Sequence, residues 1–120
     1  MKKSRILLVD DHALLRHGLA LILGYQKDVT VVGEAENGKA AIALAEETKP
    51  DLVIMDLMMP VMDGIEATAQ IKAKVPEAKV IVLTTFSTSD GIAKALKNGA
   101  SGAIFKSAAD TELIKMIRQV

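Results

Sequence analysis

The stretch of sequence that decides the fold is Asp51-Leu52-Val53-Ile54-Met55-Asp56. The apolar residues inside it form an uninterrupted run, which is typical of a parallel strand covered on both faces. Asp56 comes where such a strand leaves the core. In an open α/β sheet, ligands bind at the edge formed by the carboxyl ends of the strands. We therefore expect Asp56 to stand at that edge, before a loop marked by Pro60 and Asp63-Gly64.

Short apolar runs and helical patterns alternate along the rest of the chain. The apolar runs predict four more strands, over residues 5–9, 29–34, 79–83 and 102–105. Helical spacing and end signals predict helices over about residues 12–23, 38–48, 64–74 and 90–97, and a last one that runs up to Val120. Asn37 is expected to cap the second helix, and Gly99 is expected to end the fourth.

This order of elements predicts an α/β fold with a doubly wound, five-stranded parallel sheet and five helices. Alternation with short links leads to right-handed crossovers that cover both faces of such a sheet. The 120 residues are expected to form one domain, residues 1–120. In the first helix, we expect Leu15, Leu19 and Ile22 to face the core, because they repeat at helical spacing.

The composition excludes several classes of protein. The formal net charge is zero, which argues against a nucleic-acid-binding surface within these residues. No cysteine is present, so disulfides and thiolate metal sites are excluded. No apolar run approaches the ~20 residues that a membrane helix needs, and the run that follows Arg5 is too short for a signal peptide. We expect a soluble, cytoplasmic domain.

Polar residues follow four of the predicted strands: Asp10-Asp11, Asp56, Thr84 and Lys106. Because parallel strands end at one edge, these side chains are expected to gather there. Carboxylates that lie close together repel one another, and a hard cation such as Mg²⁺, held by oxygen ligands, relieves that repulsion. An ammonium group and a hydroxyl would hold phosphoryl oxygens. The set indicates phosphoryl transfer, with Asp56 as the nucleophile.

Each of these residues alone has a more ordinary interpretation. An acid after a strand is often a helix cap or a solvated loop residue, and Lys106 alone would most often be a surface lysine. The joint placement at one edge is what favours a functional site. His12 and His17 show no metal-ligand spacing with another His or Cys, so we interpret both as ordinary residues of the helix surface.

These motifs resemble the receiver domain of bacterial two-component response regulators over essentially the whole chain. The matching segments are Leu7–His12, Pro50–Asp56, Met59-Pro60 with Met62–Gly64, Leu83-Thr84, and Gly99–Gly102 leading to Lys106. Val32–Gly38 and Thr84–Phe86 resemble the NarL/LuxR-type subfamily. The resemblance implies a flavodoxin-like sheet with strand order 2-1-3-4-5. It also implies a phosphorylation-controlled switch that regulates transcription through a DNA-binding helix-turn-helix outside these residues.

The resemblance implies a role for each acid at the strand ends. Asp56 would accept a phosphoryl group from a phosphohistidine of a sensor histidine kinase. Asp11 and Asp56 would bind Mg²⁺ directly, and Asp10 would act through a water molecule. The backbone carbonyl of Met58 would be a further ligand of the ion.

The same resemblance implies that Thr84 and Lys106 hold the phosphoryl oxygens, and that movement of the Thr is coupled to an aromatic residue on the fifth strand. Here Ala103 occupies that position, and a methyl group has no other rotamer to adopt. An interaction module that signals without phosphorylation is therefore an alternative. A Mg²⁺-dependent phosphatase is another, although Met58 stands where such enzymes carry a second acid. Beyond autocatalytic transfer to and from Asp56, we expect no enzyme activity.

Leu14 and Leu21 lie on a stripe of the first helix outside its expected core face. We therefore expect a weak homodimer through this helix, with Ile114 as a further contact. No membrane partner is expected. DNA is expected to be bound only through an output domain that is not part of these residues.

Overall fold

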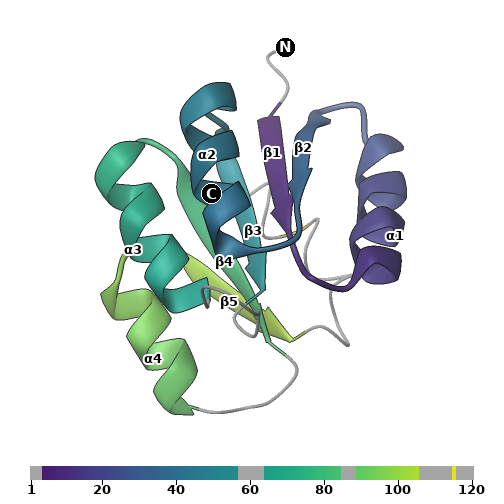
Figure 1. Ribbon diagram of the computed structural model, residues 1–120. Coiled ribbons are helices and arrows are strands. Elements are labelled where there is room, and N and C mark those ends of the chain that lie inside the picture. The colour runs from purple at the N-terminus through teal and green to yellow at the C-terminus, as the bar shows by residue number, and fades with distance from the viewer. Residues whose placement is uncertain (1–3, 57–63, 85–88, 106–114, 116–120) are drawn as a thin grey trace.

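The structure, a computed structural model, describes residues 4–56, 64–84, 89–105 and residue 115. The described strands are β1 (Ser4–Val9), β2 (Val29–Ala35), β3 (Leu52–Asp56), β4 (Lys79–Thr84) and β5 (Gly102–Phe105). The described helices are α1 (Ala13–Gly24), α2 (Gly38–Thr48), α3 (Gly64–Lys74) and α4 (Ser89–Lys97). Strands and helices alternate along the chain, as predicted (Figure 1). Of the predicted fifth helix, residue 115 alone is among the described residues, and it is helical.

The five strands form one sheet in the order β2-β1-β3-β4-β5. All four neighbouring pairs are parallel. The order confirms the predicted doubly wound, flavodoxin-like sheet. From β1 the chain adds β2 on one side, and then adds β3, β4 and β5 on the other. Such a switch point, here between β1 and β3, leaves a crevice at the carboxyl ends of the two strands. Within the described ranges, no helix is long and apolar enough to cross a membrane.

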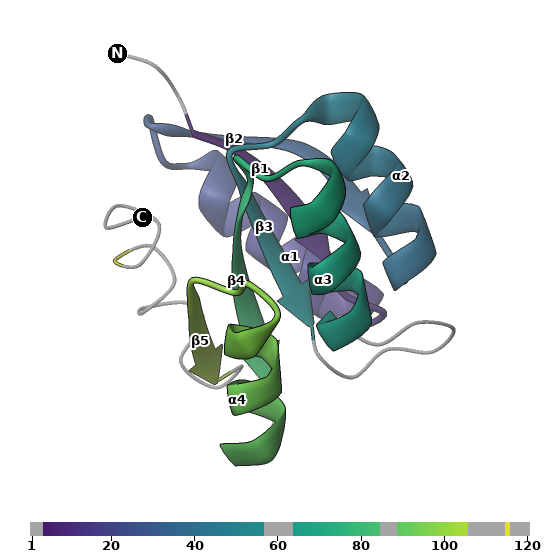
Figure 2. The same cartoon turned by 90° about the vertical axis from the view of Figure 1, so that its left-hand side faces the viewer.

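Aliphatic side chains fill the space on both faces of the sheet, because successive residues of a strand point to opposite sides. On one face, Leu7 and Val53 belong to a cluster that also contains residues of α2, α3 and α4. On the other face, Leu8 and Ile54 pack with residues of α1. Figures 1 and 2 show this division, with α1 on one side of the sheet and the other three helices opposite. Since both faces are covered, β3 is buried along its whole length.

One predicted core position of α1 is wrong. Leu15 and Leu19 pack toward the sheet as expected, but Ile22 is exposed and Leu23 is fully buried in its place. Relative to Leu19, these two residues stand at i+3 and i+4, and both spacings fit one helix face. The pattern therefore does not decide which of them faces the sheet, and the rotation of α1 against the strands does.

The beginning of α2 follows the predicted local signal. The side chain of Asn37 accepts a hydrogen bond of 2.8 Å from the backbone N–H of Ala40, which confirms it as the N-cap. At the other end, Lys49 adopts a left-handed conformation with φ of 47°, directly before Pro50. These two ends fix where the chain enters and leaves the helix between β2 and β3.

The end of α4 confirms the predicted role of Gly99, which has φ of 110°. The N–H of Ala100 donates to the carbonyl of Ala95 at 3.0 Å, and the N–H of Gly99 donates to Leu96 at 3.1 Å. This pair of bonds is the Schellman arrangement that closes a helix. A Cβ at residue 99 would lie 2.9 Å from Cγ of Lys72, so both the backbone and the space favour glycine.

We predict that Gly99→Ala lowers the free energy of unfolding by about 1–3 kcal/mol, because a side chain disfavours this backbone conformation. The new Cβ also disturbs Lys72, whose ammonium donates to the carbonyls of Pro76 and Ala78 at 2.8 and 2.9 Å. Urea unfolding measures the change. The matched control is Gly18→Ala inside α1, where a Cβ meets nothing within 4 Å. It should raise stability by about 0.5–1 kcal/mol. If both variants changed the free energy of unfolding in the same direction, the helix-ending role of Gly99 would be contradicted.

Candidate functional site

The carboxyl ends of β1 and β3 bring two acids to the switch point of the sheet. Val9 is the register partner of Met55. Continuing that register by one residue sets Asp10 beside Asp56. Both acids follow buried aliphatic residues, because each strand must leave the core at this edge before a polar side chain is tolerated.

Both of these acids are themselves buried. Asp10 is 2% exposed and Asp56 is 1% exposed, whereas Asp11 is exposed. A buried carboxylate is costly unless hydrogen bonds or a positive charge compensate it. Two of them at neighbouring strand ends, with a third acid at the surface, make this edge of the sheet attractive to a cation.

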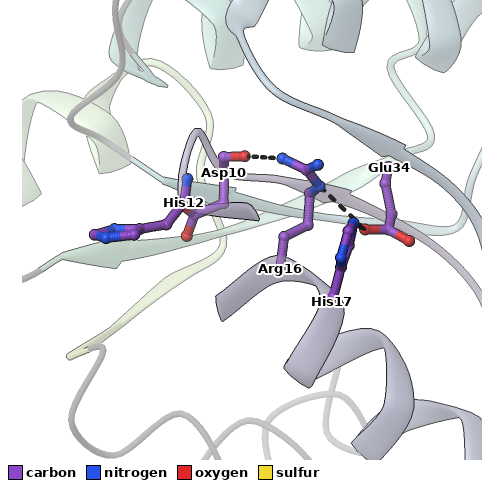
Figure 3. A network of polar contacts seen from close by, with 5 residues as sticks. All are labelled: Asp10, His12, Arg16, His17 and Glu34. Atoms are coloured by element: carbon purple, nitrogen blue, oxygen red, sulfur yellow. Dashed lines mark hydrogen bonds and ion pairs between the residues drawn. The ribbon is translucent and has the colours of Figure 1, made fainter. Parts of the chain in front are cut away.

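Hydrogen bonds fix the turn between β1 and α1. The N–H of His12 donates to Oδ1 of Asp10 at 2.8 Å. The carbonyl oxygen of Asp10 accepts from Nη1 of Arg16 at 2.6 Å, and Nε of the same guanidinium donates to Oε1 of Glu34 at 3.0 Å. Figure 3 shows Arg16 between the turn and Glu34, with His17 beside the carboxylate. The distance from Nε2 of His17 to Oε1 of Glu34 is 3.7 Å.

The turn presents groups that are suited to a metal ion. One ligand atom each from Asp10, Asp11 and His12 lie within 4.8 Å of one another. The two carboxylates are the hard oxygen ligands that Mg²⁺ takes, whereas an imidazole nitrogen suits transition metals better. The acids therefore fit Mg²⁺. From the sequence we interpret His12 as an ordinary surface residue. The structure places its exposed side chain beside Asp10 and Asp11.

The remaining predicted site residues are described in part or not at all. The backbone of Thr84 ends β4, and Thr84 is the register partner of Phe105. Lys106 follows Phe105 in the sequence but lies outside the described residues, as does Met58. The structure thus brings the ends of β1, β3, β4 and β5 to one edge, and leaves the roles of Thr84, Lys106 and Met58 as predictions.

Sequence reasoning missed Arg16 and Glu34. Arg16 lies on the helix that follows the acid pair, which is a weak signal because most helix arginines are solvated. Its partner Glu34 lies on β2, eighteen positions further along the sequence. Only the placement of β2 beside β1 brings them together, and the sequence alone did not specify that contact.

Comparison with known proteins settles the family. Residues 6–118 match the family described as Response regulator receiver domain. The chain belongs to this family. It is a receiver domain of a two-component response regulator, as the acids at the ends of β1 and β3 had suggested.

Curated relatives and solved structures agree with this assignment. The receiver domain is 44% identical over 115 residues to response regulator protein VraR of Staphylococcus aureus, covering 96% of this chain and 55% of that protein. It therefore spans about half the length of the curated relatives it matches. A receiver domain of the putative response regulator NarL from Mycobacterium tuberculosis has a TM-score of 0.93 at 32% identity, covering 99% of this chain and 96% of that one. A LuxR-family DNA-binding response regulator from Staphylococcus aureus has a TM-score of 0.90 at 30% identity, with 97% of each chain covered.

We predict that Asp56→Asn raises the stability of the metal-free receiver domain by about 1 kcal/mol, because it removes one of two neighbouring buried charges. It should also weaken the stabilisation that Mg²⁺ gives to the parent. Thermal unfolding with and without Mg²⁺ measures both effects. The control is Glu47→Gln, an exposed acid in the last turn of α2, at the opposite edge of the sheet. A parent whose stability ignores Mg²⁺ would contradict this prediction.

Proposed function

We propose that this receiver domain is a phosphorylation-controlled switch, and that Asp56 accepts a phosphoryl group from a phosphohistidine of a sensor histidine kinase. The observation that carries the proposal is the pair of buried carboxylates, Asp10 and Asp56, at adjacent strand ends. Burial of one carboxylate beside another is costly, because both lose hydration and the two like charges repel each other. A functional reason for keeping both charges is therefore favoured.

The chemistry balances with the residues at this edge. A carboxylate oxygen of Asp56 forms a bond to phosphorus while the phosphorus–nitrogen bond of phosphohistidine breaks, and the leaving imidazole takes up a proton from solvent. Later hydrolysis releases inorganic phosphate and restores the carboxylate. Because phosphoryl transfer needs little beyond positioning and charge neutralisation, a domain of this size is sufficient.

Five side chains and one backbone carbonyl would serve the transfer. Asp11 and Asp56 would hold Mg²⁺ directly with the backbone carbonyl of Met58, and Asp10 would act through water. When bound, the ion would neutralise charge on the carboxylates and on the transferring phosphoryl group. Thr84 and Lys106 would donate hydrogen bonds to the phosphoryl oxygens as negative charge gathers on them.

We place this switch in the cytoplasm, as one domain over residues 1–120 of a transcription regulator. The sensor kinase would be its phosphoryl donor, and DNA would be bound by a LuxR-type output domain outside these residues. The support is the likeness to VraR, of which this chain covers 55%, and to a LuxR-family DNA-binding response regulator. Beyond its own phosphorylation and dephosphorylation, the domain would not act as an enzyme.

A module that signals without phosphorylation is the second candidate, and Ala103 favours it. Ala103 lies on β5 and packs against the aliphatic cluster on the side of α2, α3 and α4. A methyl group in a packed cluster has no second rotamer with which to report a change at the neighbouring strand end. If phosphorylation occurs, a residue other than Ala103 must therefore transmit it.

We predict that acetyl phosphate and Mg²⁺ add a single phosphoryl group to the parent. The group should be absent in Asp56→Asn and when the metal is chelated, because the nucleophile or its charge partner is then missing. Intact-protein mass spectrometry detects it. The control is Asp51→Asn, an exposed acid whose Oδ2 accepts from the backbone of Arg5 at the opposite edge of the sheet. This variant should be labelled like the parent. No adduct in the parent, with Mg²⁺ binding measured separately, would support the phosphorylation-independent module.

We also propose a weak homodimer through α1. Leu14 is 86% exposed, Leu21 is 67% exposed, and Tyr25 is 84% exposed. Leu14 and Leu21 lie on one stripe of α1 at i and i+7, and the C-cap residue Tyr25 continues it at i+11. Ala20 and Gly24 line a shallow hollow together with Leu21 and Tyr25. The surface therefore has both projecting apolar side chains and a hollow that could receive those of a second copy. The predicted contact of Ile114 lies outside the described residues.

We predict that the sedimentation coefficient of the parent rises with protein concentration. The double variant Leu14→Glu/Leu21→Glu should sediment as a monomer, because two like charges on each copy then face one another. Both leucines are exposed, so the fold should survive, and circular dichroism checks this. The control is Leu96→Glu, an exposed leucine of α4, on the other side of the sheet. A parent that stays monomeric at high concentration, with and without beryllofluoride as a phosphoryl mimic, would refute the dimer.

A further inference from the structure

A β-bulge in β2 decides which face of the sheet Glu34 occupies. Ile6 of β1 is the partner of Val31, but Leu7 is the partner of Gly33, so the residue between them is an extra one. Side chains after a bulge point to the opposite face from the one that strict alternation would give. Glu34 therefore pairs with Leu8, whose side chain lies on the α1 side.

Core packing records the same change of face along β2. Val29 and Val31, before the extra residue, belong to or pack against the cluster on the α1 side. Ala35, also an odd-numbered position, belongs to the cluster on the opposite side. Without the bulge, Glu34 would pair with Val9 and turn away from α1. The extra residue in β2 is thus the reason that a carboxylate meets the first helix here.

Arg16 uses that carboxylate as an anchor. Its side chain is only 12% exposed, and one planar guanidinium joins Oε1 of Glu34 at 3.0 Å to the carbonyl of Asp10 at 2.6 Å. A guanidinium presents its donors in a fixed fork, so two bonds hold it in place where a single ammonium would pivot. The bridge connects α1, the edge strand β2 and the end of β1 (Figure 3).

The bridge holds the peptide between the two acids. The main-chain oxygen of Asp10 is fixed by Arg16, and Oδ1 of Asp10 accepts from the N–H of His12. With the carbonyl and the carboxylate of Asp10 both held, the direction in which Asp11 leaves the turn is held as well. The relative placement of the two carboxylates is what a small octahedral ion such as Mg²⁺ requires.

We propose that Arg16 is a positioning residue for Mg²⁺. It acts on the ion through the Asp10-Asp11 turn, and Glu34 on β2 supports Arg16. The inference rests on the proposed function, since it assumes that these acids bind Mg²⁺. Arg16 does not touch the ion. Its role is to keep the acid pair in the arrangement that the ion binds, in the way that groups behind metal ligands often set affinity.

The charge of Arg16 and its positioning role predict opposite effects of substitution on Mg²⁺ affinity, so an experiment can distinguish them. A positive charge near a cation site repels the cation, so an arginine that acted only through its charge would weaken binding of Mg²⁺. Removal of that charge would then tighten binding. If Arg16 instead holds the turn, loss of the fork weakens binding whether or not the charge is kept.

The experiment measures Mg²⁺ affinity by isothermal titration calorimetry for the parent, Arg16→Lys, Arg16→Met and Glu34→Gln. We expect both Arg16 variants to bind Mg²⁺ about 10-fold more weakly, the size usual for groups behind metal ligands. Glu34→Gln should show a smaller loss, because it keeps the guanidinium but weakens its anchor. The control is Arg5→Lys, since Nη1 of Arg5 donates to the carbonyl of Lys49 at 3.0 Å at the other end of β1. It should bind Mg²⁺ like the parent.

A second measurement needs no metal. Amide hydrogen exchange of His12, whose N–H donates to Asp10, should be faster in Arg16→Lys than in the parent and unchanged in Arg5→Lys. Unchanged Mg²⁺ affinity in Arg16→Lys, or tighter binding in Arg16→Met, would overturn the positioning role. These outcomes leave the proposed phosphorylation intact, because that fails only when Asp56 takes up no phosphoryl group. A parent that binds no Mg²⁺ would also overturn the positioning role, and the mass spectrometry of the Asp56 adduct would then decide the proposed phosphorylation separately.

Discussion

Parallel pairing of β1 with β3 aligns two strands that are buried on both faces, so that the first acid after one lies beside the last residue of the other. From Ile6 in β1 and from Leu52 in β3 up to these acids, every side chain is apolar and buried, because a polar group among the aliphatic clusters on both sides would be costly. The acids are therefore confined to the edge, and the same packing that stabilises the sheet brings like charges together there. Asp10 and Asp56 are both buried at that edge, where a cation would offset the repulsion between the two carboxylates.

Much of this arrangement could be predicted from the sequence, because the decisive signals are local. Apolar runs gave all five strands within a residue or two, and Asn37 and Gly99 marked helix ends through their own conformational preferences. Prediction failed where a choice depends on the neighbouring element. Ile22 and Leu23 both satisfy helical spacing, and only the orientation of α1 on the sheet selects Leu23. For the site, the acids were found by their place after strands, but Arg16 was not, since its role depends on contacts with β2.

The β-bulge explains why the missed contact is invisible in the pattern. Strict alternation along β2 would put Glu34 on the same side as Ala41 and Ala67, which line the cluster beneath α2 and α3. A carboxylate there would be buried among aliphatic groups at high cost. One extra residue turns it toward α1 instead, where Arg16 meets it at 3.0 Å. A local irregularity in an edge strand thus converts an unfavourable side chain into an anchor, and no periodicity calculated over the sequence would indicate it.

The acids at this edge are consequently held by two different kinds of interaction. On the side of β3, register fixes Asp56 through the backbone of the buried strands, and this is insensitive to single side chains. On the side of β2, the partly exposed carboxylate of Glu34 and the guanidinium of Arg16 fix Asp10 through its carbonyl, and this is sensitive to each of the two side chains. The fold can therefore remain intact while the placement of Asp11 relative to Asp56 changes. Ala103 is packed as a methyl group on β5 and offers no aromatic side chain at its position, so the β1–α1 turn and its bridge to β2 are described parts of the site in which single side chains govern the geometry of the acids.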